Sequence, residues 1–241
     1  VGLSFVPNDP RVVDQWQLGQ PSDHDSDVFE AWDLVQGDTT IIIAILDTGV
    51  LYSHEDLGGS APPHTAGNIA HNWIEWGGIP GVDDDANGFV DDFRGWDFVT
   101  GGSGVPGEDV SGADNDPIDF AGHGTFCAGM ASAGTDNGVG IAGTGFRARI
   151  LPLRVGYKDA ATSPGQIDIS WAAQAIVYAA NNGAHVVNCS WENFSLSALR
   201  SAVTYALSRG VTIVVAAGNA NTETPSQNYL ASRGDCIDVG A

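Results

Sequence analysis

Residues 41–49 read Ile-Ile-Ile-Ala-Ile-Leu-Asp-Thr-Gly, an apolar run that ends in a polar turn. Such a run is typical of a buried strand. Similar runs follow at 149–155, 185–190 and 211–217, and a further candidate lies at 236–240. Helical patterns occupy 27–35, 123–133, 167–182 and 196–209. Apolar strands that alternate with helices predict an α/β fold with a mostly parallel central sheet covered on both faces.

Polar residues follow the ends of three predicted strands. Asp47, Ser190 and Asn219 all fall at or just past the ends of apolar runs. In open parallel sheets, ligands bind beyond the carboxyl ends of the strands. We therefore expect one edge of the sheet to collect these residues.

The composition is that of a folded, acidic, glycine-rich protein. The 241 residues suffice for one large domain, and the net charge of −21 argues against nucleic acid or an anionic membrane as a partner. No apolar span is long enough for a transmembrane helix, and no signal peptide stands at Val1. Segment 58–122, rich in Asp and Gly, reads as a long loop insertion. The cysteines Cys127, Cys189 and Cys236 are odd in number, and each lies in an apolar context. This favours three buried thiols, or one disulfide and one thiol, over a catalytic role.

Three polar residues have the chemistry of a hydrolase site. Asp47 lies in Asp-Thr-Gly, His123 in Gly-His-Gly-Thr and Asn219 in Ala-Ala-Gly-Asn. A histidine base at neutral pH needs a carboxylate to orient it, and the developing oxyanion needs a preorganised donor. An acid, a base and an amide are three of the four parts of a serine hydrolase. The nucleophile is the part that the motifs lack.

These motifs, in this order, resemble those of the subtilisin-like serine proteases (the subtilase family), and most of all its thermitase and proteinase K branches. Gly138-Val139-Gly140-Ile141-Ala142-Gly143 and the position of Cys127 match as well. The resemblance runs over nearly the whole chain and implies a three-layer subtilisin-like fold. It also implies a secreted endopeptidase in which Asp47 orients His123, His123 is the general base and acid, and Asn219 binds the oxyanion.

The resemblance further implies a serine in a Gly-Thr-Ser-Met-Ala-like motif downstream of Asn219. No Gly-Thr-Ser occurs, and only Ser226 and Ser232 follow Asn219. We therefore expect 1–241 to be a single catalytic domain that is truncated before its serine motif, lacks its C-terminal part and is inactive alone. Its partners would be a protein or peptide substrate and, as a further candidate, its own C-terminal segment or propeptide.

Two other functions remain to be weighed. A calcium-stabilised pseudoprotease or peptide-binding domain would hold a peptide without cleaving it. An aspartic protease also uses Asp-Thr-Gly, but a second such motif is absent and the α/β pattern is wrong for that class. A substituted residue at the downstream serine position would decide for the pseudoprotease.

Substrate binding is assigned through the resemblance to two extended segments that flank the cleft. These are Gly165-Gln166-Ile167 and Ser190-Trp191-Glu192. Relatives usually carry Leu-Gly-Gly after the serine, whereas this chain carries Trp191-Glu192-Asn193. If the Glu192 carboxylate faces the primary substrate pocket, it would favour a basic substrate side chain or narrow the entrance of the pocket. The alternative is that Glu192 points to solvent.

The first predicted calcium site is an acidic loop inside segment 58–122. Its spacing of oxygen ligands, with a glycine at the sixth position, follows the logic of an EF-hand loop without the flanking helices. The closing glutamate is absent because Arg94 takes its place, so Asp91 or Asp92 must close the shell. The candidate ligands are Asp83, Asp85, Asn87, the carbonyl of Phe89, Asp91 and Asp92.

The second calcium site is implied by the resemblance alone. Relatives bind calcium between the N-terminal arm, the acidic residue after the first motif and the loop before Gly-Ile-Ala-Gly. The corresponding candidates are Asp9, Asp56, Asn137 and the carbonyls of Gly134, Val139 and Ile141.

Overall fold

The computed structural model describes residues 5–22, 24–159, 165–193, 195–219 and 228–240. Its centre is a six-stranded parallel sheet in the order β2-β3-β1-β6-β7-β8. The strands are β1 (Ile42–Asp47), β2 (Trp96–Asp97), β3 (Arg149–Arg154), β6 (Val186–Cys189), β7 (Thr212–Ala216) and β8 (Ile237–Val239). A separate antiparallel pair joins β4 (Gly156–Tyr157) to β5 (Gln166–Ile167).

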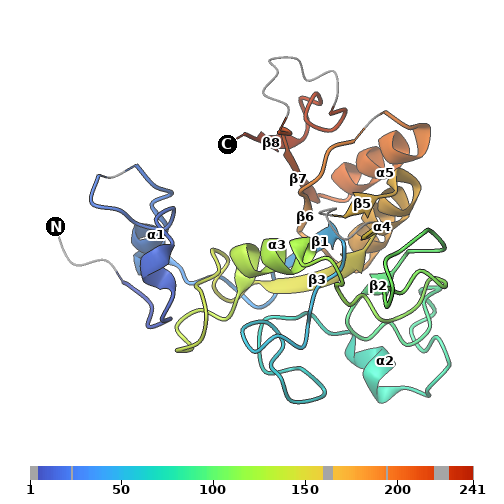
Figure 1. Cartoon of the computed structure of the whole chain (residues 1–241), viewed down its shortest axis with the longest axis horizontal. Coiled ribbons are helices and arrows are strands. Elements are labelled where there is room, and N and C mark those ends of the chain that lie inside the picture. Colours follow the sequence, from blue (N-terminus) through green and yellow to red (C-terminus); the bar gives the residue numbers. More distant parts are fainter. Residues whose placement is uncertain (1–4, 23, 160–164, 194, 220–227, 241) are drawn as a thin grey trace.

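Helices cover the sheet from both sides, which gives three layers (Figure 1). Ala44 and Leu46 of β1 pack with α4 (Ile169–Asn181) and α5 (Ser197–Ser208). Ile45, between them, points the other way and packs with Ala128 of α3 (His123–Ser132). Because side chains alternate along a strand, β1 contributes side chains to the hydrophobic cores on both faces of the sheet. The predicted three-layer α/β fold is confirmed.

The N-terminal arm forms a third, smaller core. It contains η1 (Val12–Asp14) and α1 (Val28–Leu34). Trp32 of α1 packs edge-on against Phe146, with 5.3 Å between the ring centroids. The packing ties the arm to the loop that precedes β3.

The observed bounds lie within two residues of those predicted for the four helices and five strands. The elements that the pattern did not predict are short: η1, α2 (Trp73–Gly77), β2, β4 and β5. A two-residue strand or a five-residue helix carries no readable period, so its position follows from tertiary contacts.

Segment 58–122 is anchored to the edge of the sheet as well as to loops. It provides β2, which pairs with the end of β3, and its residues Phe93 and Phe98 are buried. Arg154, which is level with Asp47 in the β1–β3 register, is fully buried. Its guanidinium pairs with Asp97 of β2 and with Glu108, 3.1 Å away. This buried charge cluster fixes the insertion beside the end of β1.

All three cysteines are free thiols, and Cys189 is buried in the core. Burial raises the pKa of the Cys189 thiol. Among the described residues, no helix has the length and apolar character needed to cross a membrane.

Candidate active site

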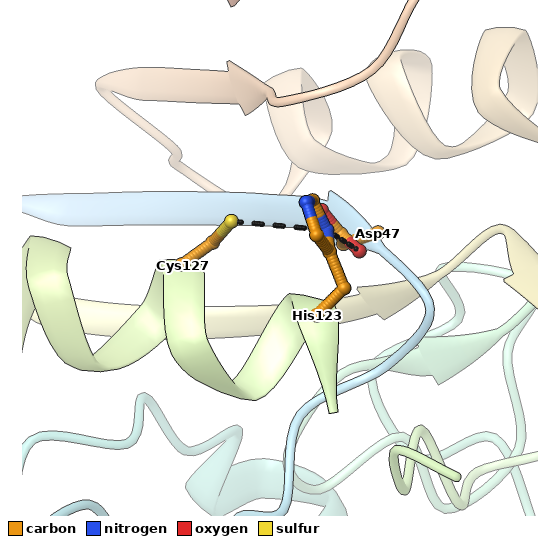
Figure 2. A group of neighbouring side chains, drawn as sticks. All are labelled: Asp47, His123 and Cys127. Carbon is orange, nitrogen blue, oxygen red and sulfur yellow. Dashed lines mark hydrogen bonds and ion pairs between the residues drawn. The ribbon is translucent and has the colours of Figure 1, made fainter. Parts of the chain in front are cut away.

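Asp47 and His123 meet at the carboxyl end of β1. Asp47 is the last residue of that strand and is almost fully buried, and His123 is the first residue of α3. His123 Nδ1 lies 2.8 Å from Asp47 Oδ1 and 3.0 Å from Oδ2, as Figure 2 shows. The backbone N–H of Thr48 donates to Oδ1 as well (2.7 Å), which fixes the carboxylate. The side chain of His123 is 41% exposed, so the ring remains accessible on one side.

The Asp47 carboxylate holds a proton on His123. Its hydrogen bond to Nδ1 raises the pKa of His123 to about 10, and a weaker contribution comes from Cys127, whose Sγ lies 3.9 Å from the same nitrogen. These three side chains are also close enough to bind one metal ion. The sequence did not assign Cys127 a place beside the ring, although its position four residues after His123 puts it on the same face of the helix.

A second carboxylate, Asp119, fixes the start of α3. One oxygen accepts hydrogen bonds from the Thr48 hydroxyl and from the N–H groups of Ala121 and Gly122, each at 2.9 Å. The other accepts both the N–H (2.9 Å) and the hydroxyl (2.6 Å) of Thr125. A carboxylate at a helix N-terminus satisfies N–H groups that have no partner within the helix. Sequence reasoning missed Asp119 because nothing in its local pattern marks it.

Close backbone packing completes the junction. A Cβ on Gly124 would lie 2.1 Å from the carbonyl oxygen of Gly49 and 2.9 Å from the Cβ of Asp47. Only glycine therefore lets α3 approach the end of β1 closely enough for His123 to reach Asp47. This close approach explains the glycine that follows His123 in the Gly-His-Gly motif.

The ends of β6 and β7 lie beside the end of β1, on the same edge of the sheet. The registers pair Ile45 with Asn188 and Cys189 with Val215, so the chain leaves all three strands at a similar level. Trp191 is buried, and its Nε1 donates to the carbonyl of Leu46 (2.7 Å). Asn193 is buried too and is bonded to residues 228–230.

Trp191 and Asn193, which flank Glu192, are both held by these contacts. The side chain of Glu192 lies toward the end of β7. Its Oε1 accepts a hydrogen bond from the backbone N–H of Asn219 (2.9 Å) and lies 2.9 Å from the position that a Cβ on Gly218 would take. The Glu192 carboxylate therefore faces the predicted oxyanion residue. Ser190 Oγ accepts a bond from Asn188 Nδ2 (2.9 Å).

The other predicted substrate segment, 165–167, also borders this edge. Gln166 and Ile167 form β5, and Gly165 has a φ of +115°. A Cβ on Gly165 would lie 2.4 Å from Thr48 Cγ2, so the segment packs directly on the residue after Asp47.

One group of predicted metal ligands joins the N-terminal arm to the rest of the protein. Asp9 and Asp56 are both buried. Asp9 accepts from the N–H groups of Asp136 (2.8 Å) and Asn137 (3.1 Å), and Asp56 accepts from Asn137 Nδ2 (3.0 Å) and the Ile141 N–H (2.9 Å). Gly134 donates its N–H to the Asp56 carbonyl, and the Asn137 side chain accepts from the Val139 N–H. Burial, reinforced by the nearby charge of Asp9, raises the pKa of Asp56.

The acidic loop forms a second group around Asp85 and Asp92. With Glu75 of α2, these carboxylates place ligand atoms within 4.8 Å of one another. Asn87 Nδ2 donates to both Asp85 and Asp92, and so does the side chain of Asn72. Burial raises the pKa of Asp92, and the neighbouring Asp85 charge adds to the shift.

The remaining predicted ligands of this loop, Asp83, Asp91 and the carbonyl of Phe89, stay predictions, and their residues make the following contacts. Asp83 accepts from the N–H groups of Asn87 and Gly88, and Asp91 accepts from the N–H of Gly81. Phe89 packs its ring against Tyr178. The loop pattern did not predict Glu75, because this residue lies eight positions before Asp83 among aromatic residues. The oxygen ligands of the buried Glu75 and Asp92 and the half-buried Asp85 fit a hard cation such as Ca²⁺.

The sequence model of the subtilase family matches residues 38–241. The chain belongs to the subtilase family. It is 34% identical to a thermophilic serine proteinase of Bacillus sp. (strain AK1), over 99% of this chain and 46% of that protein. It is 33% identical to thermitase of Thermoactinomyces vulgaris, over 98% of this chain and 66% of that protein. The solved structure of a protease from Pseudoalteromonas arctica PAMC 21717 matches with a TM-score of 0.71 and 27% identity, over 97% of this chain and 65% of that one.

The resemblance to subtilases read from the motifs is thus confirmed. The chain spans about half to two thirds of the length of these subtilases. Of the serines after Asn219, Ser226 lies outside the described residues, and Ser232 donates its hydroxyl to the carbonyl of Tyr229 (2.7 Å).

Proposed function

We propose that this chain provides the Asp, His and Asn of a serine endopeptidase that hydrolyses peptide bonds through an acyl-enzyme. The observation that carries the proposal is the pair of contacts from His123 Nδ1 to both oxygens of Asp47. With Nδ1 held, Nε2 is the ring nitrogen left to take a proton from a nucleophile and return it to the leaving amine. Asn219 is the proposed oxyanion donor, and loss of such a donor costs about 3 kcal/mol of transition-state stabilisation.

The nucleophile is proposed to be a serine outside this chain. Among the described residues, the hydrogen bonds of the His123 ring go to Asp47 and Cys127. The greater length of the relatives supports a further segment. So does β8, where Ile237 and Val239 are 53% and 54% exposed on a strand that has no described neighbour on its outer side. Exposed apolar strand edges are normally covered.

The proton on His123 has a consequence for this mechanism. The hydrogen bond to Asp47 raises the pKa of His123 to about 10 and favours its charged form, whereas a general base works best with a pKa near the operating pH. Covering the ring disfavours its charged form and lowers the pKa. We therefore propose that the covering segment and the bound substrate lower the pKa of His123 toward neutral pH. We also propose that the 241-residue chain alone is inactive because it lacks the nucleophilic serine.

The proposed substrates are proteins or peptides, bound as an added strand between 165–167 and 190–192. The contact between Glu192 and the Asn219 N–H supports a site wall with a carboxylate, which favours basic side chains. We also propose that the protein is secreted.

Calcium is proposed as a structural ion at two places. Asp9, Asp56 and Asn137, with nearby carbonyl groups, would hold one ion, and Glu75, Asp85, Asn87 and Asp92 the other. The raised pKa values of Asp56 and Asp92 support this, because each buried carboxylate has an acidic neighbour that a cation would neutralise. When bound, calcium would tie the arm and segment 58–122 to the domain.

The test uses the natural protein that contains this chain. We expect it to hydrolyse casein and to react with a fluorophosphonate, a reagent for activated serines. Asp47→Asn and His123→Ala should each lower kcat by a factor of roughly 10³ or more without loss of folding. Hydrolysis that is unaffected by His123→Ala would contradict the proposal. Peptide binding without any cleavage would favour the pseudoprotease.

A further inference from the structure

A cavity of about 500 Å³ lies beside α2, in a part of the fold that the proposed active site does not use. Its apolar walls are Tyr52, Trp76 and Phe93. Phe93 is buried and forms the centre of a stack, with its ring centroid 4.4 Å from that of Trp76 and 5.4 Å from that of Trp73. Both tryptophans are more than half exposed, so this aromatic cluster offers apolar ring surface to solvent.

Arg94 enters this cavity between two rings. Its guanidinium carbon lies 4.3 Å from the centroid of Tyr52 and 5.3 Å from that of Phe93. Within the described part of the chain, no carboxylate forms an ion pair with Arg94, although the protein carries a net charge of −21. Stacking and a hydrogen-bond interaction with Tyr52 hold the guanidinium in place, and its other N–H donors are available to a ligand.

Hydrogen-bond acceptors line the same cavity. Asp116 uses one carboxylate oxygen to accept the Tyr52 hydroxyl (2.7 Å), and no hydrogen bond from a described residue reaches the other. Asn115 donates its Nδ2 to the Asp91 carbonyl (2.9 Å), which leaves its side-chain oxygen as an acceptor. The site therefore offers a fixed donor and two acceptors around aromatic faces.

The remaining carboxylates of the lining are already engaged. Glu75 accepts the N–H groups of Asp84, Asp85 and Asp91 at 2.8 to 3.0 Å. Asp91 accepts the N–H of Gly81 (2.7 Å). The lining thus carries Arg94 and three carboxylates, and of these charged groups Arg94 and Asp116 keep hydrogen-bonding capacity for a ligand.

This balance selects the chemical class of the ligand. An anion would meet three carboxylates, a cation would meet Arg94, and a purely apolar molecule would desolvate Arg94 and Asp116 without replacing their hydrogen bonds. A sugar ring has an apolar C–H face for an aromatic surface and hydroxyl groups that both donate and accept. We propose that this cavity binds a neutral saccharide, with the ring stacked on Trp76 and hydroxyls bonded to Arg94, Asn115 and Asp116.

The experiment titrates the 241-residue chain with cellohexaose and chitohexaose, monitored by calorimetry and tryptophan fluorescence. We expect saturable binding of at least one of them, and a loss of affinity of roughly tenfold in Trp76→Ala. Trp16→Ala is the matched control, because Trp16 is 68% exposed but does not line this cavity. Its affinity should stay within about twofold of the unmodified chain.

Arg94→Met and Asp116→Asn test the polar contacts without opening the aromatic stack. Each should weaken binding while circular dichroism and thermal unfolding remain close to those of the unmodified chain. The proposal is overturned if neither sugar saturates the chain at about 10 mM, a weak limit for a specific site. It is also overturned if Trp16→Ala costs as much affinity as Trp76→Ala. A third contrary outcome is that the cationic hexamer of glucosamine binds more tightly than chitohexaose.

Discussion

Asp119 holds Thr125 by both of that residue's hydrogen-bond donors, its N–H at 2.9 Å and its hydroxyl at 2.6 Å. The same carboxylate accepts the Thr48 hydroxyl, which in turn accepts the N–H of Gly124 (3.1 Å). One side chain thus connects the residue after Asp47 with the helix turn that carries His123. The geometry of the Asp47–His123 pair depends on this connection.

Asp119→Asn should therefore change the geometry of the Asp47–His123 pair, although Asp119 contacts neither side chain. An amide accepts through one oxygen only, so at least two of the five hydrogen bonds are lost, which destabilises the fold by about 2–3 kcal/mol. The pKa of His123 should fall from its raised value toward 6.5, as measured by NMR titration of the ring. Asp109→Asn is the control, because the Asp109 carboxylate bonds to the adjacent turn at Ser111. An unchanged His123 titration in a destabilised Asp119→Asn variant would show that Asp119 has no positioning role.

The pH dependence of the His123–Asp47 pair is a second prediction. The pKa of His123 in the folded protein, about 10, lies above its ordinary value of 6.5, so the folded state binds the extra proton. The pair should stabilise the fold fully below pH 6.5, and its contribution should be lost as the pH rises through 10. In Asp47→Asn the midpoint should drop toward 6.5 and this pH dependence should disappear. A His123 titration midpoint near 6.5 in the unmodified chain would contradict the proposal that Asp47 holds a proton on His123.

Removal of calcium should lower the melting temperature. With calcium at about 100 times the Kd of one site, binding stabilises the fold by ~2.7 kcal/mol, and EDTA removes this contribution. Asp56→Asn and Asp85→Asn should each remove part of the EDTA response, because they weaken different sites. Asp38→Asn, at an exposed carboxylate bonded to nearby Thr40, should leave it intact. An unchanged melting temperature on adding EDTA to the unmodified chain would refute both metal assignments.

Glu192 should control which side chain precedes the cleaved bond. Its carboxylate lies against the Asn219 N–H, so in the natural protein we expect substrates with Arg at this position to be cleaved faster than those with Phe. Glu192→Gln should reduce the Arg-to-Phe ratio of kcat/KM by roughly tenfold, since one charge contact is removed. Equal cleavage of Arg and Phe substrates by the unmodified protein would reject a carboxylate in the pocket.

Much of this fold was readable from local pattern. The run that ends at Asp47 and the helix that starts at His123 were both predicted, because each is a mostly apolar stretch next to a recognisable polar motif. By contrast, α2 and Glu75 were not predicted. The helix has only five residues, and Glu75 reaches Asp85 and Asp92 only after segment 58–122 has folded back on itself.

The sequence by itself determined the family, the parallel sheet and the identity of Asp47 and His123 as a candidate pair, since apolar runs and glycine-flanked motifs are local properties. Tertiary structure alone decided which partners the charged side chains contact. Asp119 beside Thr48, Glu192 against Asn219 and Arg94 over the ring of Tyr52 each join residues at least 27 positions apart. Hydrogen bonds and ring contacts act over only a few ångströms, so folding must bring such residues together before their chemistry can be known.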